Sequence, residues 1–198
     1  MSQEHLQNHL FPIFLKLREV PTLLVGGGNV GLEKLEALLK NDAEALVHIV
    51  APEIREEIQE LAKTHQGITL EFRAYEPSDL DNFRVAILAT DQPELHKEIK
   101  ALALIKKVLV NVADTPDLCD FYLGSTVKKG ALKIGISTNG QSPTLAKRIR
   151  ELLEEVLPDD TPQLLKNLKA IRDRLKGDFE FKVNKLNDIT TKMLKDDE

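Results

Sequence analysis

The chain alternates short apolar runs with longer helical patterns, and this alternation limits the folds open to it. Five runs are nearly continuously apolar, as in strands buried on both faces of a sheet: they are 22–26, 46–51, 68–73, 85–90 and 108–113. Between them lie three stretches with apolar residues three or four positions apart: 29–40, 52–65 and 93–107. This order predicts an α/β fold, a parallel sheet with helices on both faces.

The pattern changes after Ala113. The runs 121–127 and 131–137 flank Lys-Lys-Gly, which predicts an antiparallel hairpin with Gly130 at the turn. The hairpin has no obvious partner in the first sheet, and an uncovered strand edge invites pairing with another chain. A Ser-Pro pair at Ser142 then predicts a helix start, and the charged sequence from Thr161 onward indicates further helices.

The composition excludes several classes of protein. With 198 residues, of which 42% are hydrophobic and 30% charged, the chain can bury one sizeable core. It has no run near the roughly 20 apolar residues of a spanning helix and no signal-peptide pattern. A lone Cys119 excludes an internal disulfide and fits a cytoplasmic protein. The net charge of −5 argues against nucleic-acid binding. We therefore expect neither nucleic acid nor membrane as a partner.

Three glycines mark the end of the first predicted strand. Gly26, Gly28 and Gly31 form G-x-G-x-x-G at the start of the first helix, the setting in which this motif indicates dinucleotide binding in a Rossmann-like fold. The glycines would permit a tight turn, backbone approach to a pyrophosphate and close helix packing. The alternative is a glycine-rich turn without a ligand.

One part of the dinucleotide fingerprint is missing. The second strand should end in an acid that holds the adenine ribose, but Ala51 and Pro52 occupy its tip. We interpret Glu53, just beyond this tip, as a first-turn acid of the next helix, and the alternative is a contact with the ribose. Arg55 is the only candidate for a 2′-phosphate, and we interpret it as a solvated helix residue. With no arginine placed for a 2′-phosphate, the sequence favours NAD over NADP.

Polar residues end the fourth and fifth strands, where parallel sheets bind ligands. The fourth ends with Thr90 and Asp91, and the fifth with Asn111 and Asp114. Asp91 could instead cap the following helix, and Asp114 could instead serve a turn.

Four segments together carry a resemblance to a known family. The segments 11–34, 89–99, 110–127 and 131–151, with their VGGG, ATD, N-V-x-D and S-x-x-G-x-S-P elements, resemble the siroheme synthase N-terminal family. These are precorrin-2 dehydrogenases, some of which also insert ferrous iron into sirohydrochlorin. The resemblance implies a homodimer that contains a Rossmann domain at 1–113, a strand-containing dimerisation segment at 114–150 and a helical domain at 151–198.

The resemblance also implies site residues. The expected NAD contacts include the motif glycines and Asp91. They are Gly26, Gly28, Asn29, Val30, Gly31, Val50, Ala51, Thr90 and Asp91. Asp114 takes the place of the catalytic aspartate. The substrate is a tetrapyrrole rich in carboxylates, and we expect it to contact Asn111, Lys128, Ser137, Thr138, Ser142, Lys147 and Arg148. Thr138 stands where some members have a serine.

Two questions stay open at this stage. Iron insertion leaves no recognisable set of metal-ligand residues in a sequence, so the sequence does not decide whether the chelatase activity is present. Ferrous iron is a second substrate only if it is. No fixed metal site is predicted, because His5 and His9 have helical spacing but lie outside any predicted cleft. The alternative function is a nucleotide-binding Rossmann module that regulates a partner protein.

Overall fold

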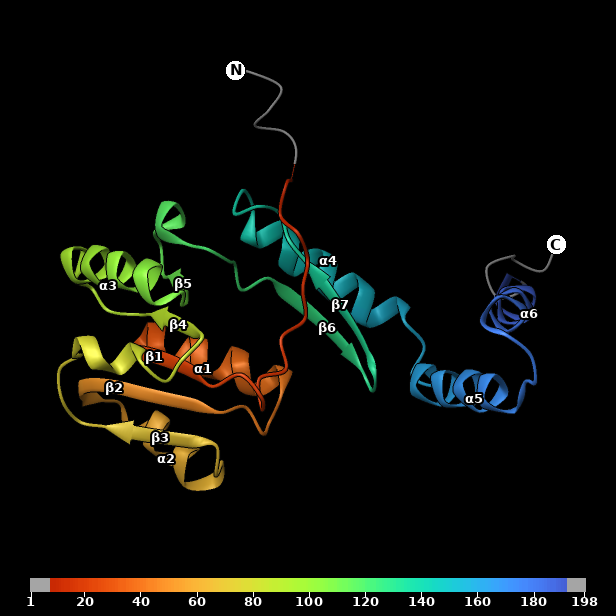
Figure 1. The fold of residues 1–198 in the computed structure, drawn as a ribbon, viewed down its shortest axis with the longest axis horizontal. Helices are drawn as coiled ribbons and strands as arrows, with labels where there is room; N and C mark the ends of the chain where they lie inside the picture. Colours follow the sequence, from red (N-terminus) through yellow and green to blue (C-terminus); the bar gives the residue numbers. More distant parts are fainter. Residues whose placement is uncertain (1–7, 192–198) are drawn as a thin grey trace, which may run out of the picture. The chain divides into compact units, whose positions relative to one another are not determined.

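A five-stranded parallel sheet forms the centre of the first of two compact units in the computed structural model, which describes residues 8–191. Its strands are β1 (Thr22–Gly27), β2 (Val47–Ile54), β3 (Ile68–Glu71), β4 (Val85–Leu88) and β5 (Leu109–Val112). Their order is β3-β2-β1-β4-β5, which Figure 1 shows from β3 at the bottom to β5 at the top. The predicted α/β fold with a parallel sheet is confirmed.

Helices cover both faces of this sheet. They are α1 (Asn29–Asn41), α2 (Glu56–Thr64) and α3 (Pro93–Lys106), with the short 3-10 helices η2 (Pro77–Leu80) and η3 (Pro116–Leu118). Alternate strand residues face opposite sides, so the sheet has two cores. One joins Leu24 and Ile49 to Leu35 of α1, and the other joins Leu23 to Ile99 of α3. Each fully buried aliphatic side chain contributes about 1.5–3 kcal/mol.

The second strand is longer than predicted. The predicted helix at 52–65 begins only at Glu56, because β2 continues to Ile54. After a bulge, Gly27 pairs with Ile54, whose side chain is buried in the core. The Arg55 N–H donates to the Gly27 carbonyl at 3.0 Å. This pairing with a distant segment keeps 52–54 extended, and local periodicity could not reveal it.

Of the described residues, 125–138 and 142–191 form the second unit. It holds the hairpin of β6 (Ser125–Lys129) and β7 (Leu132–Ile136), then α4 (Pro143–Val156), α5 (Thr161–Arg174) and α6 (Phe179–Thr191). Gly130 has φ +59° in the turn, as predicted. The side chain of Ser142 accepts from the Leu145 N–H and caps α4, which confirms the predicted helix start. Helix α4 packs on β6 and β7, and α5 contacts β7 and α6.

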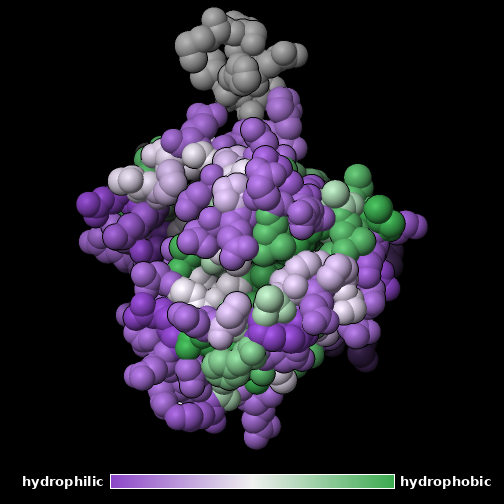
Figure 2. Space-filling view, turned by 90° about the vertical axis from the view of Figure 1, so that its left-hand side faces the viewer, coloured by the Kyte–Doolittle hydropathy of each residue, from purple (hydrophilic) through white to green (hydrophobic). Residues whose placement is uncertain are grey.

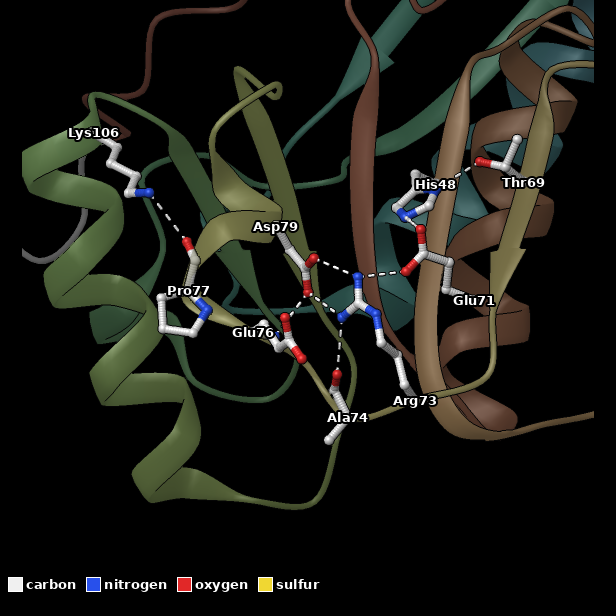
Figure 3. A network of polar contacts seen from close by, with 9 residues as sticks. All are labelled: His48, Thr69, Glu71, Arg73, Ala74, Glu76, Pro77, Asp79 and Lys106. Atoms are coloured by element: carbon white, nitrogen blue, oxygen red, sulfur yellow. Dashed lines mark hydrogen bonds and ion pairs between the residues drawn. The ribbon is translucent and has the colours of Figure 1, made fainter.

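A polar network ties the end of β3 to η2 (Figure 3). The Arg73 guanidinium donates to both carboxylate oxygens of Asp79, at 2.6 and 2.9 Å, and forms an ion pair with Glu71. Asp79 also accepts from the Glu76 N–H at 2.8 Å. Burial acts to raise the pKa of Asp79, but these donors outweigh it and lower the pKa. The network holds η2 where the side chain of Leu80 enters the core.

The surface of the molecule is mainly hydrophilic on the side shown in Figure 2, with hydrophobic side chains exposed in separate patches. Leu104 and Ile105 of α3 are about three-quarters exposed, at 76% and 78%. Within residues 8–191, none of the helices combines the length and apolar character needed to cross a membrane.

We expect Asp79→Ala to lower the free energy of unfolding by about 2–3 kcal/mol, because it removes charged hydrogen bonds from a nearly buried carboxylate. The folded pKa is depressed, so this contribution is present above about pH 4 and is lost as the pH falls through the folded value. Urea denaturation at pH 7 and pH 3 measures both effects. Asp81→Ala removes an exposed ion pair with Lys106 and should change stability by less than about 1 kcal/mol. Equal losses in the two variants would contradict the role of the network.

Candidate functional site

The carboxyl ends of β1, β4 and β5 meet at one edge of the sheet because neighbouring strands run parallel. The chain leaves β1 for one side of the sheet and returns to form β4 on the other, which makes this edge a topological switch point. The Ala89 N–H donates to the Val25 carbonyl at 2.8 Å, and the Ala113 N–H donates to the Leu88 carbonyl at 2.9 Å. The segment that follows β4 therefore begins beside the glycine-rich loop, and the segment that follows β5 begins one strand further along the same edge.

The three motif glycines have different surroundings. Gly26 has φ +118°, and a Cβ there would lie 2.4 Å from the Ala89 carbonyl oxygen. A Cβ on Gly31 would lie 2.3 Å from the Gly26 carbonyl oxygen, so both positions require glycine for packing. A Cβ on Gly28 would meet nothing within 4 Å. Gly28 caps α1 without a side-chain hydrogen bond to the helix amides. The loop thus offers open space at a helix N-terminus, which fits a pyrophosphate.

Two other predicted cofactor residues, Val50 and Ala51, can act only through their backbone. Val50 is fully buried and Ala51 is 4% exposed, with both side chains in the core. Val30 is half-buried and packs against the core below the loop. Backbone groups are therefore what these positions can offer a ligand.

The structure corrects the interpretation of Glu53 and Arg55. Glu53 lies in β2 rather than in the first turn of a helix. Arg55 is exposed, as expected, but it is the N-cap residue of α2 rather than a residue within the helix. The Arg55 guanidinium donates to Oδ1 of Asn29 at 2.5 Å and to both carboxylate oxygens of Glu57, at 2.5 and 3.1 Å. An arginine therefore does lie beside the glycine-rich loop, contrary to the sequence-based expectation.

A buried histidine lies within hydrogen-bonding distance of the Thr90 hydroxyl. The Thr90 hydroxyl lies 2.8 Å from Nε2 of His96, a residue of α3 that is 4% exposed. Burial lowers the pKa of His96, against a smaller opposing effect of Asp91, so the imidazole is neutral at pH 7. Gln92 is the N-cap of α3, so the alternative that Asp91 caps this helix is wrong. Asp91 is exposed at the edge of the sheet.

Asp114 is exposed and holds a strained backbone. Its φ is +56°, a left-handed conformation that residues other than glycine seldom adopt. The Cys119 thiol stabilises this turn by hydrogen bonds to the Thr115 carbonyl at 3.4 Å and the Val112 carbonyl at 3.2 Å. Burial raises the pKa of the Cys119 thiol, so it stays protonated. Strain held in place by surrounding contacts is typical of functional residues.

The segment after Cys119 folds back along the outer edge of β5. The Asp120 N–H donates to the Val110 carbonyl at 2.7 Å, and its carboxylate accepts from the Val110 N–H at 2.9 Å. The amide of Asn111, which is 6% exposed, donates to the Phe121 carbonyl at 2.9 Å. These contacts give Asn111 a structural role in covering the sheet edge, and its predicted substrate contact stays a prediction.

The other predicted substrate residues belong to the second unit. Thr138 and Ser142 contact each other, since the Thr138 hydroxyl donates to the Ser142 carbonyl at 3.1 Å. Lys147 and Arg148 of α4 both pair with Glu151, and Lys128 is exposed on β6. Ser137 follows β7. The cations on α4 are therefore partnered by an acid of the same helix.

The described histidines do not gather into a metal site. Across residues 8–191, no three or more His, Cys, Asp or Glu side chains are placed to hold a metal ion. His5, one of the pair considered above, lies outside the described residues.

Comparison with known proteins agrees with this geometry. Residues 13–125 match the family model described as putative NAD(P)-binding, and 129–155 match the one described as sirohaem biosynthesis protein central. Siroheme synthase of Ectopseudomonas mendocina (strain ymp) is 42% identical over 168 residues, covering 85% of this chain and 35% of that protein. The siroheme synthase of Nitrosomonas europaea is 32% identical over 174 residues, covering 88% and 36%.

A solved structure is also similar. SirC, precorrin-2 dehydrogenase, is 25% identical with a TM-score of 0.67, and the match covers 94% of this chain and 90% of that one. The chain spans about a third of the length of the curated relatives it matches. The resemblance to the siroheme synthase N-terminal family, stated from four sequence segments, is confirmed. Since the NAD(P)-binding model covers residues 13–125, more than half of the 198-residue chain, the chain belongs to the putative NAD(P)-binding family.

Proposed function

We propose that the protein is an NAD-dependent dehydrogenase that oxidises precorrin-2 to sirohydrochlorin in siroheme biosynthesis. One observation supports this most: the open glycine-rich loop and the strained, exposed Asp114 lie at the same edge of the parallel sheet. The likeness to SirC and to siroheme synthases supports the choice of substrate. A regulatory nucleotide-binding module would not need a strained carboxylate at this edge.

The chain's own residues then have separate tasks. The α1 amides and Gly28 hold the pyrophosphate, and Thr90, oriented by His96, contacts the cofactor beyond it. NAD, when bound, accepts the hydride. Asp114 accepts the proton that the macrocycle loses, since an exposed carboxylate at this edge can reach a substrate. The positive φ of Asp114 sets the direction of its Cα–Cβ bond before the substrate arrives.

Cations of the second unit are proposed to bind the substrate carboxylates. Lys128, Lys147 and Arg148 lie on β6 and α4, near Ser137, Thr138 and Ser142 in the sequence. For Lys147 and Arg148, a substrate carboxylate would replace Glu151 as the partner. Ferrous iron as a further substrate and a cytoplasmic location remain parts of this proposal that rest on the family resemblance and the single cysteine.

A homodimer is also proposed, and an apolar stripe on α4 supports it. Leu145, Leu152 and Val156 lie on one side of this helix and are 52%, 57% and 66% exposed. Their spacing of seven and four residues makes one continuous apolar row. Together with the two-stranded sheet of β6 and β7, this row offers a second copy both strand edges and an apolar face.

We expect Gly28→Val to abolish NAD binding, measured by calorimetry, while the melting temperature stays within a few degrees of the parent protein. The fold has room for a side chain there, but the added methyl groups would occupy the space of the pyrophosphate. Gly31→Ala is the matched control, and it should lower the melting temperature because its Cβ would strike the Gly26 carbonyl. Unchanged NAD affinity in Gly28→Val would remove the loop from the cofactor site.

We expect Asp114→Asn to lower kcat for precorrin-2 oxidation by about a hundredfold to ten-thousandfold, the usual contribution of a positioned general base. Asn tolerates the left-handed conformation, so the turn should be retained, and NAD affinity should not change. Asp114→Gly should show the same loss with the backbone strain relieved. Asp117→Asn, a neutralised acid three residues away, should keep full activity. A nearly normal rate in Asp114→Asn would assign this residue to the turn alone.

We expect light scattering at micromolar concentration to give twice the 22.2 kDa mass of the chain. Leu152→Glu should shift the protein towards monomer, because it places a charge in the apolar row. Leu104→Glu is the control, since it makes the same change at an exposed leucine of α3 and should leave the dimer intact. A monomeric parent protein would rule the proposed dimer out.

A further inference from the structure

An arginine–glutamate pair lies at the carboxyl end of β2, beside the glycine-rich loop. The Arg55 guanidinium contacts Glu57 through two nitrogen atoms and reaches Asn29 of the loop with a third. Its backbone is fixed as well, through the bond from the Arg55 N–H to the Gly27 carbonyl. The hydrogen bonds from Arg55 lower the pKa of Glu57, which is therefore ionised at neutral pH. The guanidinium is held close to the loop with its charge neutralised.

This pair borders a surface depression of about 580 Å³, lined by Arg55, Glu56, Glu57 and Glu60. Three of these four residues are acids. Apart from Arg55, the lining therefore presents negative charge to any ligand that enters from the loop.

The position of the depression determines which part of a dinucleotide it would meet. In Rossmann folds the ribose of the adenosine lies at the end of the second strand, where an acid selects NAD and an arginine accepts the 2′-phosphate of NADP. In this chain Ala51 and Pro52, which follow the Val25–Val50 pair, stand at the usual place of the acid, level with the start of the loop. Glu53, an exposed acid, follows them one residue before the end of β2. Arg55 has the fork of donors that a phosphate requires, but Glu57 occupies two of them.

We propose that Glu57 sets the cofactor preference of this protein: by pairing with Arg55 it removes a ready-made 2′-phosphate site and so selects NAD over NADP. The inference rests on the proposed function, because it takes the glycine-rich loop to be the pyrophosphate site. The specificity that an acid at the strand tip usually supplies comes here from the first turn of α2. An uncharged 2′-hydroxyl is accepted beside the pair, whereas a 2′-phosphate meets a neutralised guanidinium among carboxylates.

The test measures the binding of NAD, NADP and 2′,5′-ADP by calorimetry to the full chain and to Glu57→Gln. The substitution keeps the size of the side chain and removes its charge. We expect the affinity for NADP and for 2′,5′-ADP to rise at least tenfold, and the affinity for NAD to change less than about threefold. The gain should decrease steeply with salt, because it comes from a newly available charge.

Two further variants separate the pair from the general charge of the depression. Glu60→Gln removes one negative charge from the same lining, but Glu60 pairs with Lys63 and not with Arg55, so the gain for NADP should be much smaller. Adding Arg55→Gln to Glu57→Gln should abolish the gain. Circular dichroism of each variant checks that the fold is retained.

The outcomes are distinct from those that test the proposed function. An unchanged affinity for NADP in Glu57→Gln, or an equal gain in Glu60→Gln, would overturn the inference while leaving an NAD-dependent enzyme in place. A parent protein that binds NADP more tightly than NAD would overturn it as well. Selective NAD binding that depends on Glu57, in a protein that fails to oxidise precorrin-2, would uphold the inference and reject the proposed substrate.

Discussion

The close contact between the first turn of α1 and the end of β1 is the constraint on which the first unit depends. A Cβ on Gly31 would lie 2.3 Å from the Gly26 carbonyl oxygen, so only glycine lets the helix approach the strand this closely. The approach carries Leu35 into the core against Ile58 of α2. It also points the uncapped amides of α1 at the edge where the strands end. The packing of α1 and the proposed pyrophosphate site therefore have the same origin.

Three of the proposed contact residues at this edge are held by residues that are not themselves proposed to bind a ligand. His96 contacts the Thr90 hydroxyl from within the core, and the Cys119 thiol braces the turn that contains Asp114. Arg55 does the same for Asn29 in the glycine-rich loop. Such supporting contacts restrict the side chains before a ligand arrives, which lowers the entropic cost of binding and of reaction.

Charge is distributed differently in the two units. The sheet edge presents backbone amides, which suit a pyrophosphate, and the exposed carboxylates of Asp91 and Asp114, which suit a proton. The second unit presents cations that are mostly paired, as with Lys129 and Asp159 at 2.7 Å and Arg150 and Glu154 at 2.5 Å. An exposed pair such as Arg148 with Glu151 contributes little to stability, so exchanging its carboxylate partner for another costs the fold little.

The sequence by itself determined the five strands, the order of the helices, the glycine-rich loop and the family, because these depend on local periodicity and on motifs at fixed spacing. Thr90 and Asp114 could be chosen in the same way, since both follow apolar strands. Tertiary structure alone decided that β2 continues to Ile54, because Gly27 pairs with it from a distant part of the chain. It likewise placed Arg55 against Asn29, 26 positions earlier, and His96 behind Thr90. No local pattern encodes such contacts, because side chains far apart in sequence meet only when the sheet forms.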